Sequence, residues 1–259
     1  MDLPLPPGKV PVLPFIKTNM VFSQKYGRTY HYPFSPGTTS DDRINQHYEE
    51  HIAPIPALVH TEKLDGENNC LNRYGVFARS HAAPTQSPWT RYLRDRWELI
   101  RHDLGDLEVF GENLYAIHSI EYHQLEHHFY VFAIRDRDRW LSWEETRFYA
   151  QLLDFPLVPE LEVVQAPFRP GVIEKQVKGW ATQNSRLGSH DALTGQPCTM
   201  EGIVTRNTDA YTADAFGQNV FKYVRAGHVK TDEHWTRNWK RASLLRERPA
   251  DVLPQPTIR

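Results

Sequence analysis

The chain has 259 residues, 40% of them hydrophobic and 12% aromatic, which is enough to bury a substantial core. Its 30 Lys and Arg nearly balance its 32 Asp and Glu, so the overall charge favours no particular partner and any nucleic-acid site must be a local patch. The two cysteines, Cys70 and Cys198, argue against a disulfide framework or a cysteine-based zinc site, and neither a signal peptide nor a membrane-spanning run is recognisable, so a cytoplasmic protein is expected.

Residues 1–56 form a candidate N-terminal extension that is rich in Pro, Gly, Ser and Thr. Within it, residues 25–43 (KYGRTYHYPFSPGTTSDDR) place prolines and a glycine between aromatic residues, which favours an ordered loop over a linker. A short helix is expected over 44–52. We therefore expect the extension to pack on the main domain.

Strand-like runs dominate the middle of the chain, and their pattern predicts a meander of antiparallel strands. The predicted strands are 58–63, 68–71, 74–80, 107–117, 129–135, 201–206 and 219–224. Because few helices separate these runs, the sequence predicts an α+β fold with antiparallel sheets. The main domain is placed at 57–226, followed by a short basic tail at 227–259 that is expected to be helical around 234–245.

The clearest helix is predicted over 87–105, where Ser87 and Pro88 suit its start and Gly105 suits its end. Five apolar residues form one stripe along it: Trp89, Leu93, Trp97, Ile100 and Leu104. Three arginines lie away from the stripe, namely Arg91, Arg94 and Arg101. A solvated face is the simpler interpretation of these arginines, and contact with phosphates is the alternative.

Two further segments have a clear local signal. Ser142 and Glu145 fit a capping box at the start of a second helix over 142–153. Residues 183–199 are polar and rich in turn residues, so a long surface loop is predicted there.

The segment TEKLDGENN, residues 61–69, contains a lysine two residues before an acid that a glycine follows. Such a pattern alone is a weak signal, and Lys63 by itself would be interpreted as a surface lysine beside a turn. Five further motifs follow it in order: FARS with Arg79, VFGE with Glu112, FYVF with Phe132, EGIV with Glu201 and VFKY with Lys222. Each lies on a strand-like segment, so together they are far more specific than any one of them.

In this order the motifs resemble those of ATP-dependent RNA ligases of the bacteriophage RNA-ligase-2 group, in the covalent nucleotidyltransferase superfamily. The resemblance covers about residues 58–225 and implies the nucleotidyltransferase (ATP-grasp-like ligase) fold, with antiparallel sheets flanked by helices. It implies ATP, Mg²⁺ or Mn²⁺, and RNA with 5′-phosphate and 3′-OH ends, joined through lysyl-AMP. We expect a role in RNA repair, with a possible partner protein. A C-terminal oligonucleotide-binding barrel is not expected, because it needs more chain than follows Lys222.

The resemblance also implies roles for individual residues. Lys63 would be the nucleophile, Lys222 would contact the α-phosphate, and Glu201 would hold the metal ion, directly or through water. Glu112 would hold the ribose hydroxyls and is a second candidate metal ligand, and Phe132 would stack on adenine. A nearby cation, either the metal or Lys222, is expected to lower the pKa of Lys63 so that its amine becomes nucleophilic.

The other candidate nucleotide-binding residues lie close to these motifs. Arg79 would contact phosphate or ribose. Asp65 and Gly66 would shape the turn that exposes Lys63, since glycine lets the backbone approach a ligand. Three further candidates are Glu62, Asn68 and Arg225.

Two positions depart from the family pattern. Family members often carry a second lysine two residues after the last one, and here Val224 stands there. The cation is therefore missing or replaced from elsewhere, with Arg225 or Lys230 as candidates. An aspartate often follows the stacking phenylalanine, and here Ala133 takes its place.

These departures leave two alternatives open. One is transfer of a nucleotide to a different acceptor, as in cap-type guanylyl transfer or protein AMPylation. The other is a degenerate RNA-binding module that has lost catalysis, for which Val224 and Ala133 are the warrant. Residues 123–127 also match the zinc-peptidase pattern H-x-x-E-H, but they link two predicted strands, and that chemistry needs a helix.

Overall fold

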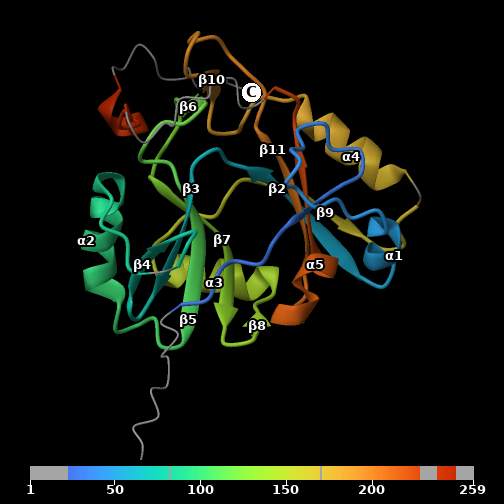
Figure 1. The fold of residues 1–259 in the computed structure, drawn as a ribbon, viewed down its shortest axis with the longest axis horizontal. Helices are drawn as coiled ribbons and strands as arrows, with labels where there is room; N and C mark the ends of the chain where they lie inside the picture. Colours follow the sequence, from blue (N-terminus) through green and yellow to red (C-terminus); the bar gives the residue numbers. More distant parts are fainter. Residues whose placement is uncertain (1–22, 82, 170, 228–237, 249–259) are drawn as a thin grey trace, which may run out of the picture.

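The structure is a computed structural model that describes residues 23–81, 83–169, 171–227 and 238–248. Two large β-sheets face each other, and helices cover their outer surfaces (Figure 1). The five-stranded sheet has the order β1 (Tyr30–His31), β13 (Val220–Val224), β11 (Gly202–Asn207), β2 (Ala57–Lys63) and β9 (Glu160–Gln165). The six-stranded sheet has the order β12 (Tyr211–Thr212), β8 (Arg139–Trp140), β7 (Phe129–Asp136), β5 (Leu107–Asn113), β3 (Glu67–Asn72) and β4 (Gly75–Ala78).

The remaining elements are shorter or flank the sheets. The helices are α1 (Tyr48–Ile52), α2 (Arg91–Ile100), α3 (Trp143–Leu152), α4 (Val172–Ala181) and α5 (Phe216–Asn219), with 3-10 turns at η1 (Pro88–Thr90), η2 (Ala213–Ala215) and η4 (Leu245–Glu247). A two-stranded ribbon pairs β10 (Ser189–Asp191) with β6 (Ile120–Tyr122). All pairs of these strands are antiparallel except β1 with β13, so the predicted α+β class with antiparallel sheets is confirmed.

Alternation along the central strand β2 explains where the site lies. Leu58 packs into a core with α1 and α4, whereas Val59 packs into the core between the two sheets. Successive side chains of a strand point to opposite faces, so Thr61 and Lys63 share the face of Val59. The last residue of β2 therefore points toward the opposing sheet.

On the opposing sheet, β7 carries a bulge at Phe132. Phe110 pairs with Ala133 and Gly111 pairs with Val131, which leaves Phe132 as the extra residue. As a result both Phe132 and Ala133 reach the core between the sheets, although they are adjacent in the chain. The bulge thus aims Phe132 at the same space as Lys63.

Several predicted elements are confirmed with shorter bounds. The helix expected over 87–105 starts as η1 and ends at Ile100, and Gly105 has a positive φ of 54° in the following turn. Arg94 donates to the carbonyl of Ser87 at 3.0 Å and to Thr90 Oγ1 at 2.6 Å, so its guanidinium is held against the start of this helix. The capping box at Ser142 is present at the start of α3.

Other expectations are wrong. Residues 183–199 are not one long surface loop, because they contain β10, and Ser185 and Ser189 are buried. The predicted tail helix around 234–245 lies in part outside the described residues. Where that segment is described, residues 238–244 form no helix, and η4 is its 3-10 turn.

Residues 23–56 are built into the main domain. Their strand β1 extends the five-stranded sheet in parallel beside β13, and Tyr26 packs into the core between the sheets. Residues 123–127 link β6 to β7 without a helix, and the described residues contain no group of three metal-ligating side chains. No helix among them is long and apolar enough to cross a membrane.

Candidate active site

A cavity of about 950 Å³ is lined by side chains from both large sheets and from the N-terminal segment. That volume suits a nucleotide-sized ligand. The candidate site residues that line it are Glu62, Lys63, Gly66, Asn68, Arg79, Glu112, Phe132 and Lys222. Long-range strand pairing thus brings motifs from the whole main domain to one place.

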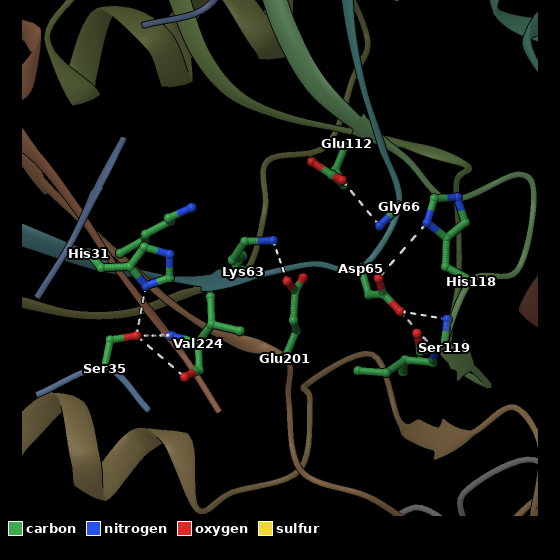
Figure 2. A network of polar contacts seen from close by, with 12 residues as sticks. His31, Ser35, Lys63, Asp65, Gly66, Glu112, His118, Ser119, Glu201 and Val224 are labelled. Atoms are coloured by element: carbon green, nitrogen blue, oxygen red, sulfur yellow. Dashed lines mark hydrogen bonds and ion pairs between the residues drawn. The ribbon is translucent and has the colours of Figure 1, made fainter. Parts of the chain in front are cut away.

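Lys63 is the last residue of β2, and Gly202 of β11 is its partner across the sheet. This pairing puts Glu201 beside it, and Lys63 Nζ donates to Glu201 Oε1 at 2.5 Å (Figure 2). The Lys63 side chain is 28% exposed and that of Glu201 is 7% exposed. The amine is therefore held inside the cavity by a buried carboxylate and stays accessible.

The pKa of Lys63 is set by two opposing effects. Burial lowers the pKa of Lys63, but the nearby carboxylates of Glu201, Glu112 and Asp65 outweigh it, so the pKa lies above its ordinary value. The predicted net lowering of this pKa by a nearby cation is therefore wrong for the protein by itself, and lowering by a bound metal ion stays a prediction. Without added positive charge, Lys63 is protonated at neutral pH, and its ammonium form is not nucleophilic.

The residues after Lys63 hold the turn in place. Asp65 Oδ2 accepts hydrogen bonds from the backbone N–H groups of Ser119 and Ile120, at 2.8 and 2.9 Å (Figure 2). A Cβ on Gly66 would lie 2.5 Å from the carbonyl oxygen of Asn113, so only glycine fits there. Asp65 thus ties the turn to the segment before β6, and Gly66 lets the turn pack against the end of β5.

Glu112 comes from β5 and faces the same cavity. Its Oε1 accepts a hydrogen bond from the Gly66 N–H at 3.1 Å (Figure 2). Burial, together with the charges of Glu201 and Asp65, raises the pKa of Glu112 to about 8 against the opposing effects of Lys63 and the Gly66 N–H. At neutral pH the protein alone thus favours a protonated Glu112.

A model of the RNA ligase family matches residues 56–224. The chain belongs to the RNA ligase family. Solved structures of the Naegleria gruberi RNA ligase share this fold. A mutant with ATP and Mn is 19% identical, has a TM-score of 0.51, and the match covers 82% of this chain and 59% of that chain. A mutant with AMP and Mn is 20% identical, has a TM-score of 0.50, and the match covers 83% of this chain and 59% of that chain. This family member spans about three-fifths of the length of those structures. No curated protein sequence matches it.

Two residues beside Phe132 line the cavity although the sequence analysis did not predict them as site residues, namely Tyr26 and Arg206. Tyr26 lies edge-on to Phe132, with ring centroids 5.1 Å apart. The Arg206 guanidinium lies 5.7 Å from the centre of the Phe132 ring, and its Nη1 donates to Thr61 Oγ1 at 2.6 Å. Arg206 stands two residues after Val204 on β11, so strand alternation could have placed it on the same face.

Lys222 lies on β13, in line with Val204 of β11 and Thr61 of β2. Its Nζ donates to Oδ1 of Asp42 at 3.1 Å, and Asp42 also lines the cavity. Burial lowers the pKa of Lys222, and Asp42 offsets only part of this effect. Asp42 had no local signal in the sequence, because its partner is far along the chain.

Two of the predicted nucleotide-binding residues, Glu62 and Arg225, differ from the others in their surroundings. The carboxylate of Glu62 is buried and accepts hydrogen bonds from Ser185 Oγ and the Arg186 N–H, both at 3.1 Å, so it anchors the start of the 183–199 segment. Arg225 and Val224 are not among the residues that line the cavity. Arg79 lines it and is exposed, and its role as a phosphate or ribose ligand stays a prediction, as does that of Asn68.

The unusual pKa of Glu112 gives a prediction for stability. The protonated carboxyl stabilises the fold fully below its ordinary pKa of 4.5, and this contribution is lost as pH rises to about 8. Glu112→Gln should therefore gain stability relative to wild type by roughly 1–3 kcal/mol between pH 5 and pH 8. Urea unfolding of both proteins at the two pH values measures this difference. An equal difference at both pH values would contradict the assignment.

Proposed function

We propose that this protein is an ATP-dependent RNA ligase that joins a 3′-OH to a 5′-phosphate through lysyl-AMP on Lys63. The observation that carries the proposal is the pairing of Lys63 with the buried Glu201 at a cavity that Lys63 lines together with Glu112, Phe132 and Lys222. Membership of the RNA ligase family supports it, as do the Naegleria structures that hold ATP or AMP with Mn.

In the first step the Lys63 amine attacks the α-phosphorus of ATP, a nitrogen–phosphorus bond forms, and pyrophosphate leaves. Glu201 holds the Lys63 ammonium in place before the reaction, and the amine must lose a proton before it attacks. Mg²⁺ or Mn²⁺, held by Glu201 together with the phosphates, would neutralise phosphate charge and oppose protonation of Lys63. This donor set suits a cation that keeps several waters and shares phosphate ligands.

The other residues position the nucleotide. Lys222 faces the cavity and would balance negative charge on the α-phosphate. Phe132 and Val204 provide apolar surface for the base, and Glu112 would bind the ribose hydroxyls. Correct alignment of the amine with the α-phosphorus accounts for much of the rate in such transfers.

Two further steps complete the joining reaction. An oxygen of the RNA 5′-phosphate attacks the phosphorus of lysyl-AMP, and the bond to the Lys63 nitrogen breaks. The RNA 3′-OH then attacks the 5′-phosphate, and AMP leaves as the RNA bond forms. A role in cytoplasmic RNA repair, together with a partner protein, belongs to the same proposal.

RNA joining tests the proposal. The protein is incubated with Mg²⁺, ATP and a labelled RNA that carries a 5′-phosphate and a 3′-OH, either single-stranded or nicked in a duplex. We expect a joined product with ATP and none with GTP or without nucleotide. Labelling with GTP alone would favour cap-type transfer, and AMP attached to added protein would favour AMPylation. RNA binding without any covalent product would favour the degenerate binding module.

A further inference from the structure

The position of the missing second lysine is covered by the N-terminal segment. Val224, Gly202 and Lys63 stand side by side across β13, β11 and β2. Val224 is buried, and its N–H donates to Ser35 Oγ at 2.9 Å (Figure 2). Its carbonyl accepts from the Gly37 N–H at 2.9 Å. No cation from position 224 can therefore assist Lys222, and a different part of the chain occupies that space.

The same N-terminal segment delivers a carboxylate to Lys222. Asp42 Oδ1 lies 3.1 Å from Lys222 Nζ and 3.1 Å from His31 Nε2. Its other oxygen, Oδ2, accepts hydrogen bonds from the N–H and the hydroxyl of Thr39, at 3.0 and 3.1 Å. Thr39 thus holds Asp42 through Oδ2, and the other carboxylate oxygen faces the lysine.

His31 connects this carboxylate to the strand that carries Lys222. It is Lys222's partner across the parallel β1–β13 pair, is 1% exposed, and its Nδ1 lies 2.8 Å from Ser35 Oγ. Ser35 Oγ accepts the Val224 N–H at 2.9 Å and donates to the Val224 carbonyl at 3.4 Å, so Ser35 joins His31 to the end of β13. Burial lowers the pKa of His31, which favours the neutral ring.

We propose that Asp42, fixed by its hydrogen bonds with Thr39, is a positioning residue for Lys222 in a site where position 224 supplies no second lysine. This inference rests on the proposed function of the site. A lysine has a flexible four-carbon stem, so one fixed carboxylate partner limits the orientations that its ammonium samples. Lys222 and Asp42 are only 21% and 23% exposed, which limits screening of the pair by solvent.

The test compares rates of the first step. Single-turnover formation of the AMP adduct, measured over a range of ATP concentrations, separates the rate at saturating ATP from ATP affinity. We expect Asp42→Ala to lower the saturating rate about 10- to 100-fold and Asp42→Asn to lower it less, because Asn keeps the shape of Asp without its charge. Asp41→Asn, the same charge change at the neighbouring exposed position, should stay within about two-fold of wild type.

A double variant shows whether Asp42 acts through Lys222. In a Lys222→Ala background, Asp42→Asn should cause no further loss, because the group that it positions is already absent. Independent losses that multiply, an unchanged rate in both Asp42 variants, or a faster rate would each overturn the inference. Wild-type protein that forms no adduct would overturn the proposed function, whereas a wild-type adduct with unaffected Asp42 variants would overturn only this inference.

A second readout needs no catalysis. Labelling of Lys222 by an amine-reactive reagent, followed by peptide mass analysis, reports how well its ammonium is held. Asp42→Asn should increase that labelling several-fold, and Asp41→Asn should leave it unchanged. The charged or titratable groups that act on Lys222 are Asp42, Lys63 and Glu201, with His31 beside Asp42. Equal labelling in wild type and Asp42→Asn would contradict the positioning role.

Discussion

Lys63→Arg is expected to remove adenylyl transfer completely while leaving the fold unchanged. Arginine keeps a positive charge that can pair with Glu201, but its guanidinium stays protonated and cannot attack phosphorus. The expected result is no AMP adduct in the time that wild type needs for full modification, which corresponds to a loss of at least about 10³-fold. Intact mass measures the adduct, and thermal unfolding checks the fold.

Lys25→Arg is the matched control for this experiment. Lys25 lines the same cavity from the N-terminal segment, and the substitution makes the same change of side chain. The rate at which Lys25→Arg forms the AMP adduct should stay within a few-fold of the wild-type rate. If Lys63→Arg still formed an adduct at more than about a tenth of the wild-type rate, another residue would be the nucleophile.

Lys222→Ala is expected to slow the first step by about 10²–10³-fold at saturating ATP. Lys222 is the lysine of the last motif that faces the cavity, since Val224 occupies the second position and is buried. Removing a preorganised charge that acts on the transition state lowers the rate more than it lowers ATP affinity. Single-turnover kinetics across ATP concentrations measures both quantities.

Lys175→Ala, on the exposed surface of α4, controls for loss of a lysine outside the cavity. Its rate of adduct formation and its ATP affinity should match those of wild type. A loss of less than about 10-fold in Lys222→Ala would mean that another cation serves the α-phosphate. Arg28 would then be the first candidate, because it lines the cavity from the N-terminal segment.

Local patterns in the sequence were sufficient to place the core of the site. Lys63 falls at the end of a strand because apolar residues lead up to it, and the glycine at 66 marks the turn. Glu112, Phe132 and Lys222 follow recognisable strand motifs, and the structure brings all of them to one cavity. Each of these features depends on neighbours within a few residues, which is what sequence patterns record best.

Contacts between distant segments could not be predicted in the same way. Asp42 contacts Lys222 because β1, earlier in the same N-terminal segment, pairs in parallel with β13. Neither segment has a local sequence pattern that predicts this pairing. The pKa of Lys63 depends on carboxylates that only the folded chain brings together. The sequence therefore located the candidate nucleophile and missed both its resting protonation and the acid that holds Lys222.

Two elements were missed for local reasons. Strand β9 alternates acidic and apolar residues over a short run that also suits a loop. Helix α4 carries Gly179 in its last turns, which weakens helix propensity, and it is stabilised by packing Ile173 and Val177 against the five-stranded sheet. In both cases tertiary contacts decide a weak local preference.

Self-adenylylation is the measurement that tests the central claim most directly. The protein is incubated with Mg²⁺ and ATP, and intact mass and peptide fragmentation are recorded after confirming that Lys63 is not already modified. We predict a gain of about 329 Da, the mass of one AMP in phosphoramidate linkage, located on Lys63 and absent when GTP replaces ATP. An unmodified protein, or an adduct on another residue, would contradict the assignment of Lys63 as the nucleophile.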